Sequence, residues 1–497
     1  MKHKAQILIF VLCVSYMKHK AQNYFSNRYD NTGSFDLAPA LDTFQHKYLT
    51  VGSEGFTGFN IALSLYLFNQ DGTVYKKKTY GWPGDNLQAN DGNYIRQGSN
   101  QFYACGSWVY FGYNSKAFLW RFDSNLDSMK FTSYGYPYSN NILNTFIKHR
   151  DNKIYMIGYV DDTLQTNADI LLIKTDTAGN EIWKKKIGIM GMDENAISID
   201  TLQGDLIIAG LRIVHNTSST DGFVMRLDTA GNTVWQKIVN TNGGYSGSKV
   251  LTLKDGNILV HNRYKAYTVG SNEYYRLQVQ KITSNNVLIW QKKYNVAAMY
   301  ADPSGSIIEN TQGNLVMAGQ KGYADNSITG TVNVLNQNGD SLFYKEFYQE
   351  LGSQNYFRDV IQTTDKGYCF AGFLIPVFAN GGTGTEDIWL LKVDSNFCES
   401  ALPCSSGVGI SEQEAIEGGV KIYPNPASSV LNIEFLAFNN EPATIQIIDA
   451  FGKNVLFEKL NSQVSVFNIN NLSSGIYFYK IIMGNTLIKS NKLIIQK

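Results

Sequence analysis

The sequence is poor in charged residues, in histidine and in long apolar runs, and each scarcity excludes a class of protein. Charged residues make up 17% of the 497 and balance to a net charge of +1, so no general basic surface for nucleic acid is expected. After residue 22 no run approaches the roughly 18 apolar residues of a membrane-spanning helix. The chain is therefore expected neither to bind nucleic acid nor to span a membrane.

Recognisable catalytic motifs are also missing. Neither a G-x-S-x-G motif nor a P-loop is present, and no ligand set for a cofactor can be located. The histidines beyond residue 22 show no metal-ligand spacing: His46, His149, His215 and His261. No catalytic residue, cofactor or metal is therefore assigned, although active sites can assemble from residues distant in sequence and an enzyme stays possible.

Aromatic residues and glycine are plentiful. Aromatics make up 13% of the chain, tyrosine alone numbers 31 and glycine 44. Together with the low charge, this composition favours an extracellular all-β protein.

A strand–turn–strand unit recurs along most of the chain, and its best copy is ILLIKTDTAGNEIWKKKIG at 170–188. Asp176 and Gly179 bracket a tight turn, and Trp183 follows four residues after the glycine. Further copies place Trp235, Trp290 and Phe343 at the same point, in steps of 52, 55 and 53 residues. Weaker copies lie at Asp71–Tyr75 and at Asp123, and a truncated copy with Asp394 ends the series.

A second marker keeps the same spacing. Apolar runs ending in glycine recur, with Asn262 filling one gap, at Gly52, Gly112, Gly158, Gly210, Gly319 and Gly372. Each unit of about 50 residues thus holds four short strands, which is the spacing of propeller blades. No 3.6-residue apolar period is sustained, so helices are not expected. Seven units predict a seven-bladed β-propeller.

The large aromatic after each tight turn has a structural role in this interpretation. Trp183, Trp235, Trp290 and Phe343 are predicted to pack on the neighbouring blade, each burying on the order of 150–250 Å². The D-x-x-G-x-x-x-W pattern resembles the repeats of quinoprotein-like and kelch-like propellers, with one residue fewer between Asp and Gly than in tryptophan-docking repeats. The sialidase Asp-box is also similar, but its Asp–Gly spacing is shorter, so sialidase chemistry is not carried over.

The connections between strands divide between two faces of a propeller. Tight turns lie on one face; longer loops and crossings between blades, which usually carry binding, lie on the other. The latter hold the candidate ligand residues Tyr80, Trp82, Tyr134, Tyr136, Tyr138, Tyr245, Tyr300 and Tyr356. Aromatic rings there suit sugars, but packing of these residues on their own blades is the alternative.

Acidic residues recur just before the third strand of several units: Asp169, Asp221, Asp387 and, near the same place, Glu273. Such residues either ring one end of the channel and bind a cation or satisfy backbone N–H groups. The second explanation is the more common one, so no metal site is assigned.

The four cysteines outside the N-terminal apolar run fall into two pairs with different settings. Cys398 and Cys404 flank the break at the end of the last repeat and could close a small disulfide loop in an oxidising compartment, the alternative being two free thiols. Cys105 and Cys369 lie in strand-like runs and are expected to be small buried residues.

Composition shifts divide the chain into four parts. Residues 1–22 have a basic start and a short apolar run and predict a secretory signal peptide. Residues 23–404 hold the repeats, and 405–418 are polar with Gly and Ser, as expected for a linker. Residues 419–497 change pattern to alternating apolar positions between turn signals, which predicts a small Ig-like β-sandwich.

The C-terminal module carries specific motifs: Tyr423, Pro424, Asn425 and Pro426, a hairpin at Asp449–Gly452, and Gly475 with Tyr477. It closely resembles the type A C-terminal sorting domain of the type IX secretion system of Bacteroidetes. The resemblance implies passage to the periplasm, recognition by the type IX machinery, and then release or attachment to the cell surface. An ordinary adhesion module is the alternative.

These observations lead to two functional hypotheses. The first is a secreted or surface-displayed binding or adhesion protein, monomeric, whose ligand is a polysaccharide or a protein. The alternative is a surface glycan hydrolase or lyase with carboxylates in the propeller depression.

Overall fold

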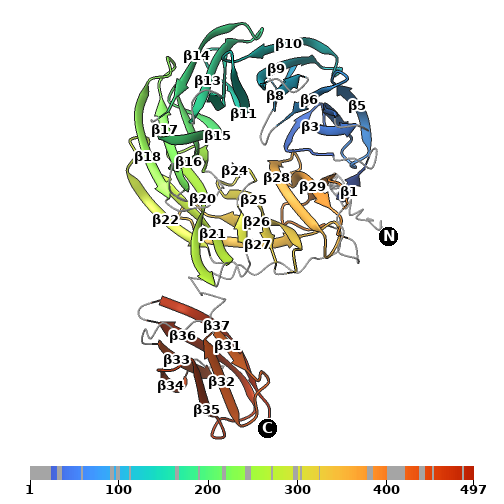
Figure 1. Ribbon diagram of the computed structural model, residues 1–497. Helices are drawn as coiled ribbons and strands as arrows, with labels where there is room; N and C mark the ends of the chain where they lie inside the picture. The colour runs from blue at the N-terminus through green and yellow to red at the C-terminus, as the bar shows by residue number, and fades with distance from the viewer. Residues whose placement is uncertain are drawn as a thin grey trace, which may run out of the picture.

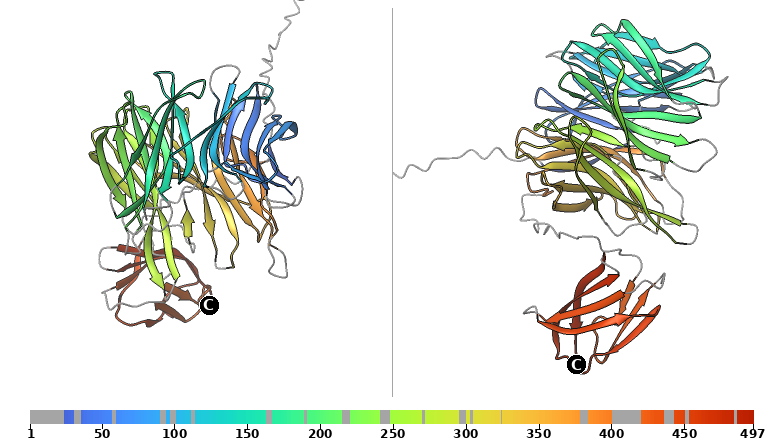
Figure 2. Two further views of the ribbon diagram at one scale, coloured as in Figure 1. Left: turned by 45° about the horizontal axis from the view of Figure 1, so that its top comes forward. Right: turned by 90° about the vertical axis from the view of Figure 1, so that its left-hand side faces the viewer.

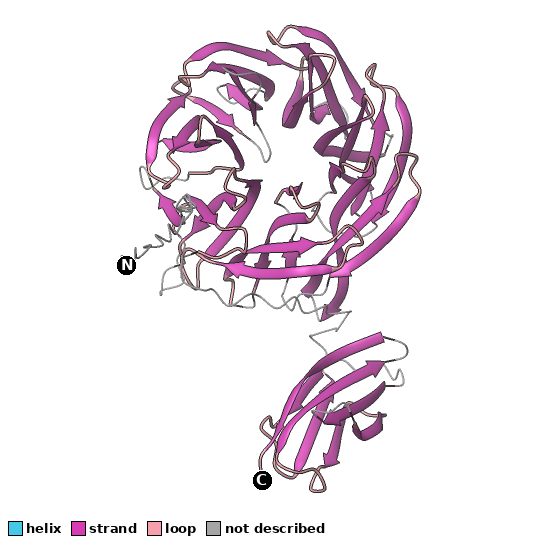
Figure 3. Ribbon diagram, turned by 180° about the vertical axis from the view of Figure 1, so that it is seen from behind, coloured by secondary structure: helices cyan, strands magenta, loops and turns pink. Residues whose placement is uncertain are grey.

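The computed structural model describes residues 24–30, 36–56, 60–89, 94–96, 101–110, 114–162, 167–188, 191–214, 220–240, 248–269, 272–294, 300–302, 305–323, 325–377, 384–399, 420–435, 443–449, 453–483 and 486–497. Across these ranges every helix or strand that is assigned is a strand (Figure 3). The predicted signal peptide and the predicted linker lie outside the described residues and stay predictions.

Antiparallel pairing groups the described strands up to β30 into sets, here called blades 1 to 7, and single parallel pairs of residues join some neighbouring sets into larger sheets. Blades 1 and 2 are β2 (Ala40–Phe44), β3 (Lys47–Phe56), β4 (Asn60–Phe68) and β5 (Val74–Tyr80), then β6 (Asp85–Gln88), β7 (Tyr94–Arg96), β8 (Gln101–Tyr110), β9 (Lys116–Asp123) and β10 (Ser128–Tyr134). Blades 3 and 4 are β11 (Ser139–Lys148), β12 (Lys153–Asp162), β13 (Ala168–Asp176) and β14 (Glu181–Ile187), then β15 (Met192–Leu202), β16 (Asp205–Val214), β17 (Thr220–Leu227) and β18 (Thr233–Asn240).

The remaining sets follow the same order. Blade 5 is β19 (Lys249–Thr252), β20 (Ile258–Val269), β21 (Asn272–Ile282) and β22 (Leu288–Tyr294). Blade 6 is β23 (Tyr300–Asp302), β24 (Ile307–Glu309), β25 (Leu315–Gly322), β26 (Ile328–Leu335) and β27 (Ser341–Phe347). Blade 7 is β28 (Gln354–Gln362), β29 (Tyr368–Ile375), β30 (Asp387–Val393) and, from the other end of the chain, β1 (Phe25–Tyr29).

The blades follow one another around a ring, and each turns its first strand toward the centre (Figures 1 and 2). The apolar core is divided in the same way, because each of seven buried clusters combines residues of two neighbouring blades. One cluster, for example, joins Leu171 and Ile173 of blade 3 to Tyr103 and Leu119 of blade 2. The all-β propeller class predicted from the sequence is confirmed.

Blade 7 is completed by the N-terminal strand. β1 runs antiparallel to β30, with Phe25 opposite Lys392 and Tyr29 opposite Ile388. The cluster between blades 7 and 1 accordingly contains Phe25 and Tyr29 together with Ile388 and Leu390. Among the described residues the truncated last repeat has no outer strand of its own, and residues before the first repeat supply one.

The recurring glycine lies where the second strand of a blade passes a bulge in the first. A Cβ added to Gly210 would lie 1.9 Å from the Asn195 carbonyl oxygen, and one added to Gly158 would lie 2.0 Å from that of Ile142. Any side chain would therefore force the two strands apart. In blade 2 the same place is taken by Gly106, whereas Gly112, which the pattern selected, lies outside the described residues.

The tight turn between the third and fourth strands has one geometry throughout. In its best copy the Asp176 carboxylate accepts hydrogen bonds from the backbone N–H groups of Ala178 (2.9 Å) and Asn180 (2.8 Å). The fourth residue has a positive φ, +79° at Gly179, which is why glycine or asparagine predominates there. Other blades place Leu126 and Phe397 in this conformation.

Outer-strand aromatics pack on this turn of the next blade. The Trp235 and Trp290 indole N–H groups donate to the carbonyls of Ser284 and Gln337, each at 3.0 Å. Phe343 stacks on Phe397 with ring centroids 4.8 Å apart. Trp183 lies against Gly231, since a Cβ there would be 3.1 Å from its Cη2.

Tyrosines at the end of several outer strands make a second contact with the same turns. The Tyr80 hydroxyl donates to the Leu126 carbonyl and the Tyr134 hydroxyl to the Gly179 carbonyl, both at 2.6 Å. Tyr29 of the closing strand donates to the Gly72 carbonyl in the same way. Every such bond joins two blades and contributes about 1 kcal/mol.

The C-terminal module is a sandwich of two antiparallel sheets. One sheet is β31 (Val420–Tyr423), β32 (Val430–Phe435) and β35 (Val464–Asn468); the other is β34 (Asn454–Leu460), β33 (Ala443–Asp449), β36 (Gly475–Met483) and β37 (Thr486–Ile495). Alternate residues point into one core, such as Leu431 and Ile433 from the first sheet and Ile445 and Ile447 from the second. The period of two predicted from the sequence is the period of this burial.

Replacing Trp290 by alanine should lower the free energy of unfolding by about 2 kcal/mol, because a partly buried ring and its bond to blade 6 are lost. The neighbouring Ile289 is 47% exposed, so Ile289→Ala is the control and should change stability by less than about 0.5 kcal/mol. Differential scanning calorimetry measures both. Equal losses in the two variants would contradict the docking role of Trp290.

Candidate functional site

The predicted ligand residues do not form one group in the structure. Tyr80 and Tyr134 are used to join blades, and Tyr134 is only 5% exposed, so both are corrected to docking residues. Tyr245 lies outside the described residues, and of Tyr300 only the backbone is described. Both stay predictions.

Three of the others lie at the long-loop end: Tyr136 and Tyr138 in the crossing between blades 2 and 3, and Tyr356 in β28 of blade 7. Tyr138 is 79% exposed, and the Tyr136 ring lies beneath the ammonium groups of Lys184 and Lys186, at 5.4 and 4.8 Å. Tyr356 stacks on Phe373 with ring centroids 4.5 Å apart, and the Arg358 guanidinium covers Phe373.

Trp82 belongs to an aromatic cluster that the sequence did not reveal. It stacks on Trp120 at 5.4 Å with an interplanar angle of 5°, and it meets the Phe131 ring edge to face at 5.1 Å. Trp108 lies 5.9 Å from Trp82, and its indole meets Phe131 at 90°. These rings hold Trp82 firmly in the crossing between blades 1 and 2.

A pocket of about 440 Å³ opens beside this cluster. It is lined by Trp82, Pro83, Asp85, Trp108, Tyr110, Phe131 and Ser133. Trp82 and Tyr110 are 43% and 47% exposed, so each presents ring surface to solvent. Tyr110 ends β8, and Trp82 lies in the crossing, which places the pocket on the long-loop face.

Asp85 is the acidic group of the pocket. It is 2% exposed, and its Oδ2 accepts a hydrogen bond from the Trp108 indole N–H at 2.8 Å. Among the described residues its Oδ1 has no hydrogen-bond partner. A buried carboxylate oxygen with an unused acceptor position is suited to a ligand hydroxyl.

Trp108 and Tyr110 were not among the predicted ligand residues, because that prediction considered only the longer loops and the crossings between blades. They lie two apart on β8 and therefore share one face of that strand. The sequence does show Trp108 and Tyr110 together at the end of an apolar run. Their proximity to the Tyr80–Trp82 segment arises only when the chain folds.

A second cavity, of about 380 Å³, lies among the inner strands. Its lining comes from most of the blades: Leu37, Pro39, Gln88, Ala89, Ile142, Asn144, Tyr159, Ile197, Lys249 and Phe373. Lys249 is the charged member of this set, and no carboxylate belongs to it. Buried acids nearby join blades instead, as where the Asp359 carboxylate accepts from the Leu41 N–H (2.8 Å) and the Ser306 hydroxyl (2.5 Å).

Acidic residues before the third strand of a blade pair with arginine where the structure shows their partners. Asp221 binds Arg212 at 3.0 Å, and Asp387 binds Arg28 at 2.6 Å. Asp169 and Asp221 belong to no group of described carboxylates close enough to share a cation. Among the side chains that the structure describes, the ring of acids considered from the sequence is therefore not assembled as such; the Glu273 side chain lies outside them.

Cysteines follow their predicted settings where they are described. Cys105 and Cys369 are free and buried. Cys398 is disulfide-bonded. Cys404, its predicted partner, lies outside the described residues, so the pairing itself stays a prediction.

Several motif residues of the C-terminal module connect strands. The Asn425 amide donates to the Lys492 carbonyl at 2.9 Å and accepts from the Ile494 N–H at 2.8 Å, which ties the Tyr423–Pro426 segment to β37. The Tyr477 hydroxyl donates to the Ser473 carbonyl at 3.0 Å, just before Gly475. Gly452 lies outside the described residues.

The fold and these contacts define a propeller chain that carries a separate β-sandwich module. Residues 421–496 match the family described as the secretion system C-terminal sorting domain. The module is thus a type IX sorting domain: it implies handling by the type IX secretion machinery and indicates export to the cell surface or secretion. No helix in the described part of the chain is long and apolar enough to cross a membrane.

Among solved structures the chain is similar to Drosophila plexin A in complex with semaphorin 1b, at 8% identity over 73% of this chain and 86% of that one, with a TM-score of 0.43. The β-propeller domain of the Trilobed protease from Pyrococcus furiosus matches at 9% over 76% and 100%, with a TM-score of 0.40. A GH43 β-1,3-galactosidase matches at 13% over 73% and 92%, with a TM-score of 0.33. Likenesses this distant carry no argument about function. A search of the curated proteins found no match.

Histidine is not part of either cavity. His261 is fully buried in β20, and neither ring nitrogen has a hydrogen-bond partner among the described residues. Burial, and to a smaller degree the charge of Lys249, lower the pKa of its imidazole to about 3. It is therefore a neutral core residue.

Acidification should destabilise the protein through His261. Below its unfolded pKa of about 6.5 the unfolded chain binds a proton that the folded chain excludes, so stability falls by about 1.4 kcal/mol per pH unit until about pH 3. His261→Leu should keep the stability at pH 7 and flatten this slope between pH 6 and 4. Urea unfolding at several pH values measures it, with exposed His46→Asn as the control; equal slopes in all three proteins would refute the assignment.

Proposed function

We propose that this exported propeller binds polysaccharide outside the cell, and that the pocket beside Trp82 is a sugar-binding site. The single observation that carries the proposal is the combination of two exposed aromatic rings with the half-satisfied carboxylate of Asp85. Export by the type IX route brings the protein to a compartment in which polysaccharides are accessible.

The chemistry of the pocket suits a sugar ring. The apolar C–H face of a pyranose packs on the Trp82 or Tyr110 ring, while a hydroxyl on its edge donates to Asp85 Oδ1. Trp82 is held in place by its stack on Trp120, so little side-chain entropy is lost on binding. The volume of about 440 Å³ is in the range of small-molecule sites and suits a short saccharide segment.

A glycan hydrolase, the alternative function, would require a different set of side chains in the pocket. Glycoside hydrolysis ordinarily uses two carboxyl groups that flank the scissile bond. Of the described residues that line the pocket, Asp85 is the one carboxylate. Binding without turnover is therefore the function that this arrangement supports best.

Binding should be measured with the purified protein on a glycan array, followed by calorimetry with the strongest glycan. Trp82→Ala and Tyr110→Ala should each weaken binding about tenfold, which corresponds to ~1.4 kcal/mol. Tyr75→Ala is the matched control, because Tyr75 is 59% exposed but lies at the tight-turn end of β5, and it should bind as the wild type does.

Three results would contradict the proposal. These are an array without any bound glycan, affinities unchanged in both pocket variants, and equal weakening in Tyr75→Ala. Release of reducing sugar from the bound glycan would replace binding with the hydrolase hypothesis. Thermal unfolding of each variant separates loss of a contact from loss of the fold.

A further inference from the structure

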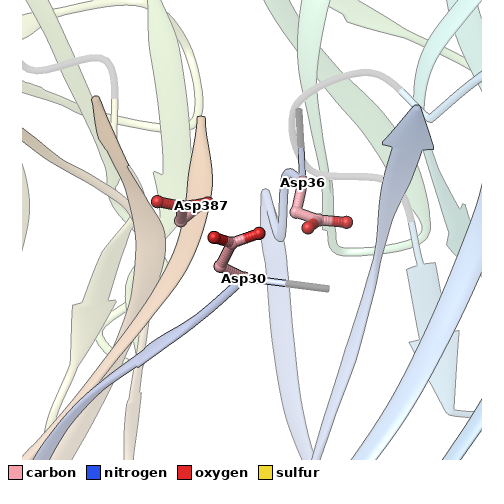
Figure 4. Close-up of side chains that lie close together, drawn as sticks. All are labelled: Asp30, Asp36 and Asp387. Atoms are coloured by element: carbon pink, nitrogen blue, oxygen red, sulfur yellow. The ribbon is translucent and has the colours of Figure 1, made fainter. Parts of the chain in front are cut away.

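Three carboxylates meet where the two ends of the propeller close. Asp30 follows β1 directly, Asp387 is the first residue of β30, and Asp36 pairs with Glu54 of β3 in blade 1 (Figure 4). Their carboxylate oxygens lie within 4.8 Å of one another. The cluster thus combines the closing strand, the last blade and the first blade.

Backbone hydrogen bonds fix the positions of these residues. The register of β1 on β30 pairs Tyr29 with Ile388, so the next step places Asp30 across from Asp387. The Asp36 N–H donates to the Glu386 carbonyl at 2.6 Å, which places Asp36 beside the same strand. Like charges directly opposite one another across strands are destabilising unless something compensates them.

Arg28 compensates only part of this negative charge. Its Nε and Nη2 atoms bind Asp387 Oδ2 at 2.7 and 2.6 Å, and its Nη1 lies 3.5 Å from Glu350. This guanidinium is therefore shared between the Asp387 Oδ2 atom and Glu350.

The second observation at this cluster concerns Asp387 Oδ1, the carboxylate oxygen that is not bound by Arg28. Asp387 is 0% exposed, and its Oδ1 has no hydrogen-bond partner among the described residues. Asp387 belongs to the same group of carboxylates as Asp30 and Asp36. A buried carboxylate oxygen left in this way costs free energy, and either a proton or a cation can relieve it. Burial, partly offset by Arg28, raises the pKa of this carboxyl.

We propose that Asp30, Asp36 and Asp387 bind a divalent cation, preferentially Ca²⁺, which fastens the N-terminal strand to the first and last blades. Two oxygens bound to one Ca²⁺ at about 2.3–2.6 Å can lie up to twice that distance apart, which fits oxygens within 4.8 Å of one another. Asp30 is exposed, so water can fill the remaining coordination positions. The affinity should be that of extracellular calcium modules, with a Kd on the order of 10⁻⁴–10⁻³ M.

The cation would act on the contact that closes the ring. Because it binds residues brought together only in the folded chain, it should stabilise the fold by mass action. This role is independent of the sugar site, which lies between blades 1 and 2 and shares no residue with the cluster.

The test uses the purified protein after dialysis against EDTA at pH 7. Titration with CaCl₂ should release or absorb heat with one site per chain, and saturating Ca²⁺ should raise the Tm measured by calorimetry. Asp387→Asn and Asp30→Asn should each weaken binding roughly tenfold or more. Glu181→Gln, a carboxylate of blade 3 that pairs with Lys184, is the matched control and should bind Ca²⁺ as the wild type does.

Asp30 is exposed, so Asp30→Asn keeps the test decisive if the buried variant misfolds. A wild-type Tm and heat signal that do not respond to Ca²⁺ would overturn the proposal, and neutralisation by protons would then be the explanation. Undiminished binding in Asp30→Asn, or equal weakening in Glu181→Gln, would also overturn it by placing the ion elsewhere.

Discussion

The propeller depends on contacts between an outer strand and the tight turn of the next blade. A blade of four strands has two apolar faces, and neither is covered unless a neighbour lies on each side. Trp235 and Trp290 reach across this boundary to backbone carbonyls. Tyr80 and Tyr134, the last residues of their outer strands, do the same. At the turn that receives Trp290 the fourth residue is Gly339, where an added Cβ would lie 2.8 Å from the Trp290 ring.

This constraint separates the two faces of the molecule. On the tight-turn face the aromatic side chains are used for docking, and the turns cannot vary without loss of that contact. The long-loop face carries no such restriction, so rings there are available to solvent. Trp82 shows the difference, because it follows Tyr80 by two residues yet lines an open pocket with Tyr110. Closure by β1 completes the ring that holds both faces in place.

Much of the fold could be predicted, but less of the site. Turn, glycine and tryptophan repeat together, so strand order and the docking of Trp235 follow from local pattern. Residue type alone does not distinguish a tyrosine that joins two blades from one that binds a ligand. Tyr134 was therefore predicted as a ligand residue, although it joins blades 2 and 3. Gly112 was selected because an apolar run ends there, whereas the close approach of Gly106 to the Gln88 carbonyl exists only in the fold. Trp108 was missed because Trp82 and Phe131 come close to it only after folding.

Local chemistry in the sequence determined the repeated strands, the turn geometry and the sorting module, because each depends on residues a few positions apart. Only the tertiary structure decided which strand closes the ring, how Trp82 meets Trp108, and that Asp30 lies beside Asp387. Those contacts join segments from distant parts of the chain, and their geometry exists only once the blades are packed around the ring.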